Sequence, residues 1–191
     1  MNHITGGFSR VCPGVVLHQL HRKGRNQKDL FGSDIAVLLF VGDKLLKFAF
    51  IQLKVAKAGK ATFEKNQIVD ALRSGYPPGA FFLMTIESTR FDCSVTETCN
   101  VNNAMIKKAT VKQLTVKTSG ARWWSFRDWV KAWISCSIGT LHNNVLARDG
   151  PSLIQLARLD ELDEEKPGTW APSMVIEVHL ESTDSLEIAR E

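Results

Sequence analysis

Hydrophobic runs and their spacing divide the chain into a series of expected strands and helices. Within residues 32–58, two apolar stretches are separated by Gly42-Asp43. Gly-Asp is typical of a tight turn between strands. The stretch therefore predicts two long strands that form a hairpin and enter the core.

The segments around this hairpin predict an alternation of helices and strands. Val16, Leu17 and Leu20 favour a helix over residues 14–21. Residues 62–74 predict a helix capped by Thr62, and the continuous apolar run at 80–86 predicts a strand covered on both faces. A helix between two strands implies a crossover and parallel pairing.

The second half of the chain has a weaker pattern. Four of the five tryptophans fall in residues 123–136, where apolar residues recur at spacings of three and four, as in an amphipathic helix. This helix can serve as a base-stacking platform or a dimer interface, but its spacing favours packing on the sheet. The other expectations are a loop or excursion at 88–110, a strand at 109–118, a loop at 137–151, a short helix at 153–162 and an edge strand at 173–180.

Length and composition indicate one folded domain over residues 1–191, with an acidic tail at about 181–191. The chain has 191 residues, of which 44% are hydrophobic. No apolar run approaches the ~20 residues of a membrane span, and the N-terminus lacks a signal-peptide core, so we expect no membrane association and a cytoplasmic location. The four cysteines are scattered, which favours simple thiols over a zinc site.

Positive charge is concentrated in the first third of the chain. Residues 1–60 hold 10 Lys and Arg against 3 Asp and Glu (+7), residues 61–120 hold 7 against 5 (+2), and residues 121–191 hold 7 against 12 (−5). Such a field attracts a polyanion, although a solvated basic surface gives the same count. The candidate phosphate contacts are Arg22, Lys23, Arg25, Lys28, Lys57 and Lys60.

Three polar residues in the hairpin are candidates for chemistry. Asp34 stands at the start of the first strand, and Gln52 and Lys54 stand near the end of the second. Because side chains alternate along a strand, Gln52 and Lys54 share one face. Charged residues are rarely buried unless they are paired or functional. The alternative is structural, with a lysine stem lying along the sheet and an aspartate capping a loop.

The order Gly-x-Asp, hairpin, Gln-x-Lys resembles the PD-(D/E)XK nuclease superfamily, in the Gln-x-Lys form of Mrr-like restriction enzymes and defence nucleases. The resemblance covers residues 15–86 best. It implies a restriction-endonuclease-like fold, an α/β domain with a mixed central sheet flanked by helices. It also implies that Asp34 and Gln52 hold a divalent metal and that Lys54 activates water and stabilises the phosphate.

The chemistry of phosphodiester cleavage suits these residue types. A carboxylate from Asp34, the amide oxygen of Gln52 and the carbonyl of Leu53 are hard oxygen ligands for Mg²⁺ or Mn²⁺. A neutral glutamine gives a weaker site than glutamate would. The expected first helix offers no glutamate to compensate. The further accessory candidates are Asp29, Gln67 and His18.

We therefore expect a metal-dependent DNA endonuclease, and the resemblance suggests a role in defence against foreign DNA. Two alternatives remain open at this point. One is an inactive restriction-endonuclease-like subunit that binds DNA or supports an assembly. The other is a nuclease gated by a partner protein, because the chain shows no separate recognition module. The expected partners are DNA and either a second copy of the chain or a regulatory protein.

Overall fold

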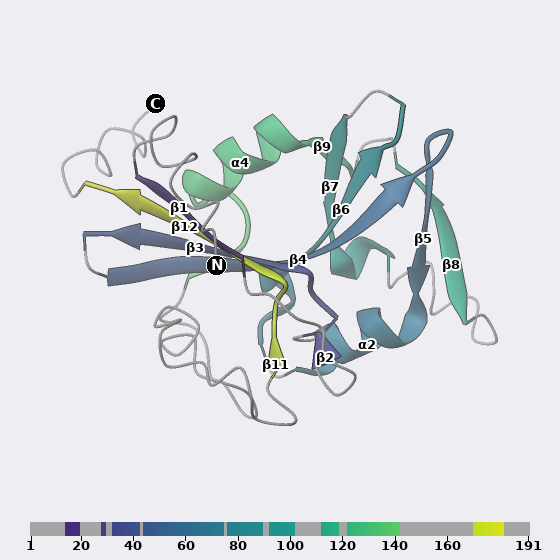
Figure 1. The fold of residues 1–191 in the computed structure, drawn as a ribbon, viewed down its shortest axis with the longest axis horizontal. Coiled ribbons are helices and arrows are strands. Elements are labelled where there is room, and N and C mark those ends of the chain that lie inside the picture. The colour runs from purple at the N-terminus through teal and green to yellow at the C-terminus, as the bar shows by residue number, and fades with distance from the viewer. Residues whose placement is uncertain are drawn as a thin grey trace.

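A computed structural model describes residues 14–19, 28–29, 32–42, 44–74, 76–89, 92–101, 112–118, 122–141 and 170–181. These residues form a mixed α/β fold in which one large sheet has helices on both faces (Figure 1). Within the described residues, no helix is long and apolar enough to cross a membrane.

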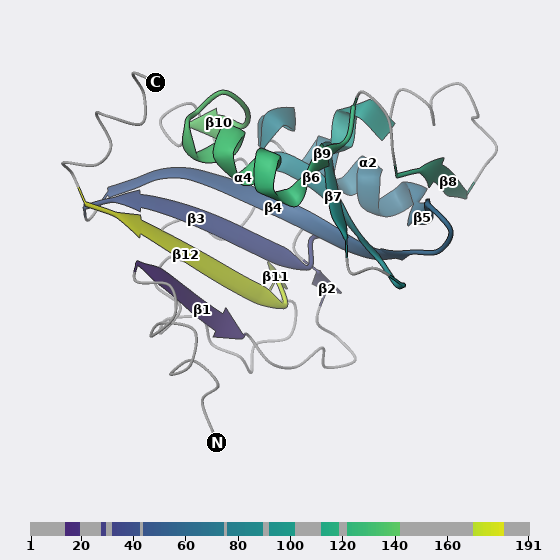
Figure 2. The same cartoon turned by 90° about the horizontal axis from the view of Figure 1, so that it is seen from above.

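The large sheet combines parallel and antiparallel strands. Its spatial order is β1-β12-β3-β4-β6-β7-β9, and β10 also pairs with β4. Figure 2 shows β1, β12, β3 and β4 side by side. The strands are β1 (Val15–Gln19), β12 (Met174–Leu180), β3 (Ile35–Val41), β4 (Lys44–Ala56), β6 (Phe81–Glu87), β7 (Cys93–Glu97), β9 (Trp124–Ser125) and β10 (Thr140–Leu141).

The predicted hairpin is confirmed, and it forms the centre of the sheet. β3 and β4 are antiparallel, with Ile35 opposite Ile51 and Val41 opposite Lys44. Gly42 turns the chain at a φ of 57°, which glycine adopts without steric cost. β4 has 13 residues and β3 has 7, so the last part of β4, from Gln52 to Ala56, continues past Ile35, the first residue of β3.

A crossover carries the chain from β4 to β6 and makes these two strands parallel, as predicted. The helix in this crossover is α2 (Lys65–Arg73), which is shorter than expected. Thr62 does not cap it. Thr62 lies in β5 (Lys60–Glu64), which pairs with β8 (Gln113–Lys117) in a separate ribbon, and its hydroxyl lies 2.9 Å from that of Thr115.

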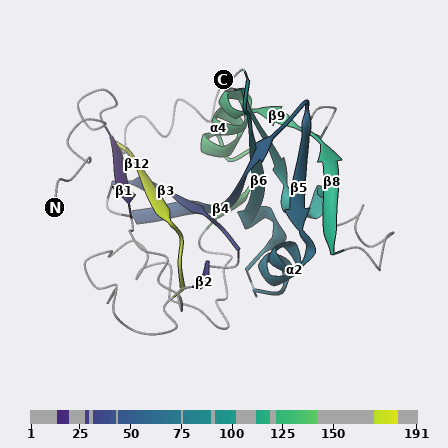
Figure 3. The same cartoon turned by 45° about the vertical axis from the view of Figure 1, so that its right-hand side comes forward.

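Helices cover the two faces of the sheet with different side chains (Figures 1 and 3). On the α2 face, Ala71 packs with the aromatic rings of Phe48, Phe50 and Tyr76. On the other face lies α4 (Phe126–Ile134), the predicted tryptophan-rich helix in a shorter form.

The spacing of the tryptophans in α4 reflects packing on the sheet. Trp129 and Trp133 are each 1% exposed and belong to the core cluster that includes Val37, Ala49 and Phe82. Ser125 caps the helix by accepting a hydrogen bond from the Asp128 amide at 3.1 Å. These buried rings are not available for base stacking.

The prediction of a helix at residues 14–21 is wrong. Val15–Gln19 is strand β1, which pairs antiparallel with β12 along its length. A helix of eight residues is too short to be stable by itself. The β-branched pair Val15-Val16 instead favours a strand where a partner is available.

Three further predictions need correction for related reasons. β12 is not an edge strand, because it lies between β1 and β3. Residues 88–110 are not a simple loop, because β7 (Cys93–Glu97) returns antiparallel to β6, and Val95 and Thr96 in it are buried. The loop expected at 137–151 contains β10, which pairs with β4.

Several expectations fall on residues outside the described ranges. These are the helix at 153–162, the acidic tail from residue 182 onward and the first part of the strand at 109–118. The remaining short strands are β2 (Lys28–Asp29) and β11 (Trp170–Ala171), which pair in parallel, and a 3-10 turn, η1 (Pro78–Ala80), precedes β6.

Candidate functional site

Asp34 lies where β3 begins and β4 extends past it. Its amide donates to the Ile51 carbonyl at 2.9 Å, and its own carbonyl accepts from the Met174 amide at 3.1 Å. Its carboxylate oxygen Oδ2 accepts from the Leu53 amide at 2.8 Å. The backbone of Asp34 is thus fixed by β4 and β12, and the carboxylate lies against the strand segment that carries Gln52 and Lys54.

Gln52 is a buried amide on the α2 face of the sheet. The residue is 5% exposed, and its side-chain amide nitrogen donates to the side-chain oxygen of Gln67 on α2. A buried polar side chain requires such a partner. The contact brings the accessory candidate Gln67 to the predicted site and holds the amide of Gln52 in one orientation.

The turn before Asp34 packs directly on the same helix. Gly32 has a φ of 72°, and a Cβ built there would lie 2.8 Å from the Cβ of Gln67. A larger residue at this position would push the turn away from α2. The Gly of the Gly-x-Asp motif therefore has a physical reason: it lets the turn before Asp34 pack closely against Gln67 on α2.

Lys54 follows Gln52 on the same face of β4 and is half-buried. Within the described part of the chain, its ammonium makes no hydrogen bond or ion pair with another residue. Its stem therefore lies among protein atoms while its charged end remains available for a ligand. An ammonium in this position can bind a phosphate oxygen or a water molecule.

Three oxygens at this end of β4 have the character of magnesium ligands. The Leu53 amide points toward Asp34, and the amide and carbonyl of one strand residue point to the same side, so the Leu53 carbonyl faces that side too. With the Asp34 carboxylate and the Gln52 amide oxygen, this gives a hard, all-oxygen donor set that suits Mg²⁺ with retained waters. In the described residues, no group of three His, Cys, Asp or Glu side chains can hold a metal ion.

The structure describes the remaining candidates from the sequence to different extents. Lys57 and Lys60 are exposed and flank the turn between β4 and β5. Lys28 and Asp29 form β2, of which only the backbone is described. Arg22, Lys23 and Arg25 fall outside the described residues.

His18 is not brought to the site by any contact. It lies on β1 opposite Val175, which itself lies opposite Ala36 on β3. At about 4.8 Å per strand, His18 is two strands away from the β3 end of the site. Its ring nitrogen Nε2 lies 3.3 Å from a carboxylate oxygen of Glu177.

Within the described residues, Cys93 and Cys99 are poor candidates for a second reactive centre. Burial raises the pKa of the Cys93 and Cys99 thiols, and the nearby carboxylates of Asp92 and Glu97 raise them further. A thiol that keeps its proton is a weak nucleophile and a weak metal ligand. Cys136 is exposed, and Cys12 falls outside the described residues.

Sequence reasoning missed a lysine that the fold brings to the same end of the molecule. Lys117 lies directly opposite Lys60 in the β5–β8 ribbon, and both are exposed. Like charges at opposed strand positions are destabilising. The pairing joins segments far apart in the sequence, so no local pattern identifies it.

Comparisons of the chain with protein-family models, with curated proteins and with solved structures find no match.

Proposed function

We propose that the protein is a metal-dependent DNA endonuclease of the PD-(D/E)XK type with a restriction-endonuclease-like fold. The observation that carries the proposal is the bond between the Asp34 carboxylate and the Leu53 amide. This bond brings the aspartate to the strand segment that carries the Gln-x-Lys pair, although the two parts of the motif are separated by a hairpin. From the resemblance, we also expect a role in defence against foreign DNA.

The chain's residues have distinct tasks in such a reaction. Asp34, the Gln52 amide oxygen and the Leu53 carbonyl would hold Mg²⁺ or Mn²⁺. The ion supplies charge stabilisation for the phosphate in the transition state. Lys54 orients the attacking water or binds the phosphate oxygen that gains charge. Gln67 positions Gln52 through their hydrogen bond.

A second candidate function is an inactive relative that binds DNA or supports an assembly. The observation that favours it is the small negative charge of the site, because the proposed ligand set contains one carboxylate and two neutral oxygens. Such a set attracts a divalent ion less strongly than one with two carboxylates. The two functions differ in one measurable respect, which is cleavage in the presence of metal.

The test is a cleavage assay on supercoiled, linear and single-stranded DNA across a titration of Mg²⁺ and Mn²⁺. We expect cleavage by the unmodified protein and none by Asp34→Asn or Lys54→Ala. Asp34→Asn keeps an acceptor for the Leu53 amide, so the free energy of unfolding should change by no more than ~1 kcal/mol. Lys44→Ala, at the other end of β4, is the matched control and should cleave normally.

Two results would reject the proposed site. Cleavage that survives Lys54→Ala would place the chemistry elsewhere. Absence of cleavage by the unmodified protein with either metal, together with retained DNA binding, would favour an inactive DNA-binding subunit or a nuclease gated by a partner protein.

A further inference from the structure

The β5–β8 ribbon forms a two-stranded sheet of its own beside the main sheet (Figure 3). Its strands pair antiparallel over five residues each, from Lys60 opposite Lys117 to Glu64 opposite Gln113. At about 3.4 Å per residue the ribbon is about 17 Å long, and its strands lie about 4.8 Å apart. An isolated pair of strands is marginally stable in water, so the ribbon needs packing on one face.

The inner face of the ribbon supplies this packing. Ala61 and Phe63 on β5 and Leu114 on β8 are buried. They belong to a core cluster with Ile68 of α2 and Leu83 of β6. Because side chains alternate along a strand, the remaining residues of both strands lie on the opposite, outer face. The packing therefore fixes the ribbon and directs its outer face to the surface.

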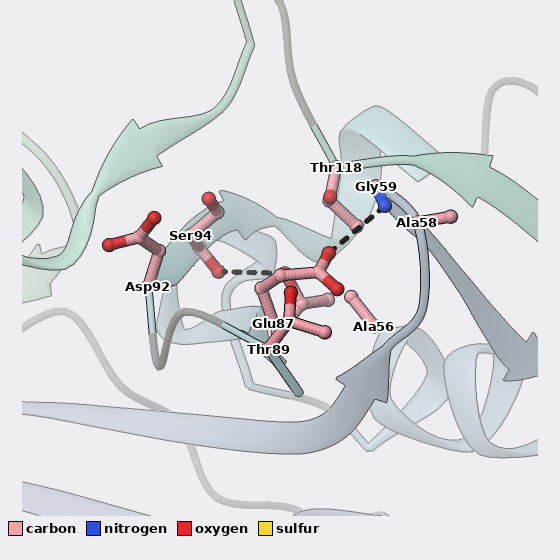
Figure 4. A pocket seen from close by; sticks show the side chains of 9 residues that line it. Ala56, Ala58, Gly59, Glu87, Thr89, Asp92, Ser94 and Thr118 are labelled. Carbon is pink, nitrogen blue, oxygen red and sulfur yellow. Dashed lines mark hydrogen bonds between the residues drawn. The ribbon is translucent and has the colours of Figure 1, made fainter.

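The base of the ribbon is fixed to the end of the main sheet around a polar pocket of about 490 Å³ beside Lys54 (Figure 4). Thr85, which lies opposite Lys54 on β6, lines this pocket. The Gly59 amide in the β4–β5 turn donates to Oε2 of Glu87 at 3.0 Å, and the Thr118 amide after β8 donates to the Gly59 carbonyl at 3.0 Å. Glu87 thus holds the turn from which both strands are anchored, and the pocket borders the inner face of the ribbon.

The outer face consists of three rows of polar side chains, each with one residue from either strand. Along β5 the rows are Lys60–Lys117, Thr62–Thr115 and Glu64–Gln113. The two threonine hydroxyls lie 2.9 Å apart, and the side-chain amide of Gln113 donates to the Glu64 carboxylate. The rows therefore present hydrogen-bond donors and acceptors on one narrow surface.

Positive charge is concentrated at one end of the outer face. Lys57 and Lys60 exchange backbone hydrogen bonds of 2.9 and 3.1 Å across the turn Ala58-Gly59, so they lie opposite each other. Lys57, Lys60 and Lys117 thus form a row across three neighbouring segments, and all three are exposed. In the described part of the chain, no carboxylate pairs with them. Like charges in opposed positions are destabilising, and a bound polyanion would remove this repulsion.

The shape of the ribbon selects among polyanions. The major groove of B-DNA is about 12 Å wide and admits a two-stranded ribbon, whereas the minor groove is about 6 Å wide. The major groove of duplex RNA is deep and too narrow for side chains to read. Duplex DNA therefore fits both the charge and the dimensions of the ribbon.

We propose that the outer face of the ribbon enters the major groove of duplex DNA and reads base sequence there, with the lysine row on the phosphates. A glutamine side chain has two N–H donors and one carbonyl oxygen. Glu64 engages one N–H of Gln113, which leaves one donor and the acceptor for N7 and N6 of adenine. This inference rests on the proposed function for its substrate, DNA, and adds the part of the chain that selects a sequence.

The first test is selection of bound duplexes from a random-sequence DNA library by the unmodified protein, with a chelator present to prevent metal-dependent cleavage. We expect enrichment of a short sequence that contains an A·T pair and binds about tenfold more tightly than a shuffled duplex. A library without enrichment would overturn the proposal. Equal binding of the selected sequence as duplex RNA would overturn it as well.

Modified bases identify the groove that is read. In 7-deaza-adenine the major-groove acceptor N7 is absent, and in 3-deaza-adenine the minor-groove acceptor N3 is absent. We expect 7-deaza-adenine at one adenine of the selected duplex to weaken binding about tenfold, and 3-deaza-adenine to leave binding unchanged at every position. The reverse pattern would place the contact in the minor groove and reject the ribbon as its reader.

A substitution then assigns the contact to Gln113. Gln113→Ala should abolish the effect of 7-deaza-adenine and leave binding to the shuffled duplex unchanged, because phosphate contacts carry no sequence information. Asn66→Ala removes an exposed amide from α2 and is the matched control, which should keep the effect. Thermal unfolding confirms that both variants are folded. An undiminished effect of 7-deaza-adenine in folded Gln113→Ala would reject the assignment.

Cleavage assays separate this proposal from the nuclease proposal. If the protein cleaves DNA but selects no sequence, the ribbon assignment fails and the nuclease stands. If it selects a sequence but cleaves no DNA with either metal, the nuclease fails and the ribbon stands. If both hold, cuts should fall outside the selected sequence, because strand alternation places Lys54 and Lys57 on opposite faces. Cuts within the selected base pairs would contradict this placement.

Discussion

Lys47 and Lys54 lie on the same strand in very different surroundings. Lys47 is 1% exposed, and its ammonium donates to the carbonyls of Trp133, at 2.8 Å, and Ile138. Burial lowers the pKa of Lys47, partly offset by nearby Cys136. Its hydrogen bonds tie the end of α4 to the sheet, so this lysine is structural, whereas Lys54 has no such partner among the described residues.

Substitution of Gln52 tests how far one neutral ligand limits the metal site. Gln52→Glu adds a negative charge that attracts the ion, and Gln67 can rotate its amide to donate to the new carboxylate. We expect the Mg²⁺ concentration for half-maximal cleavage to fall by about three- to tenfold. A cleavage titration measures this value directly.

The matched control for this prediction is Asn66→Asp, which adds the same charge at an exposed position of α2. It should leave the Mg²⁺ requirement unchanged. A requirement that rises in Gln52→Glu would mean that the Gln52 amide is needed for its hydrogen bond to Gln67 and is not a metal ligand.

Elements that pair locally were predictable, whereas elements that pair over long distances were not. The β3–β4 hairpin follows from two apolar runs and a Gly-containing turn, and its register is set by a short connection. β1 was predicted as a helix because its partner β12 lies at the opposite end of the chain. Thr62 was placed at a helix start for the same reason, since the pairing of β5 with β8 is also nonlocal.

The same contrast between local and long-distance contacts applies to the candidate site. Asp34, Gln52 and Lys54 can be predicted because both parts of the motif lie within one hairpin. The contact of Gln67 with Gln52 follows from the crossover helix, which a strand–helix–strand pattern indicates. The pocket beside Lys54 cannot be predicted, because it needs the positions of Glu87, Ser94 and Thr118 on three separate segments.

Tyr76, in the segment between α2 and β6, packs on aromatic rings of the sheet and makes the stability of the fold depend on pH. Tyr76 is 4% exposed, with its ring 5.7 Å from that of Phe48 and 5.5 Å from that of Phe50. Burial raises the pKa of the Tyr76 phenol above its usual 10.0. The unfolded chain therefore loses this proton at lower pH than the folded chain does.

It follows that the stability contributed by Tyr76 is fully present below pH 10.0 and decreases as pH rises above it. We expect the free energy of unfolding to fall less steeply between about pH 9 and about pH 11 in Tyr76→Phe than in the unmodified protein. Urea denaturation across this range measures the slope. Cys93 and Cys99 also have raised pKa values and titrate in both proteins, so they cancel in the comparison. Parallel curves for the two proteins would show that the phenol is not a buried acid.

At the scale of the whole molecule, positive charge is gathered at the end of β4 where the candidate site and the pocket meet. Lys57, Lys60 and Lys117 are exposed there, and Lys60 and Lys117 face each other across the ribbon. This arrangement costs some stability through repulsion between like charges. A polyanion bound across the three lysines would remove that repulsion, which is the physical reason to expect DNA at this end.

DNA binding should therefore weaken steeply with salt, and the three lysines should account for part of the dependence. Each phosphate that a lysine neutralises contributes about −0.9 to the slope of log affinity against log salt on duplex DNA, and about −0.7 on a single strand. Replacing Lys57, Lys60 and Lys117 together by glutamine should reduce the slope by about two to three units. Anisotropy titrations at several salt concentrations, with Lys54→Ala as the background to prevent cleavage, give the slopes.

A second triple variant separates local contacts from net charge. Lys44, Arg127 and Lys131 are also exposed, but Lys44 lies at the far end of β4, and the other two lie on α4 across the sheet from α2. Changing these three to glutamine removes the same charge and should leave the slope nearly unchanged, because a salt slope counts phosphates in contact and not the total charge. Equal reductions in both triple variants would mean that DNA responds to overall charge, and a flat salt response in the unmodified protein would remove the lysine-rich end as a DNA-binding surface.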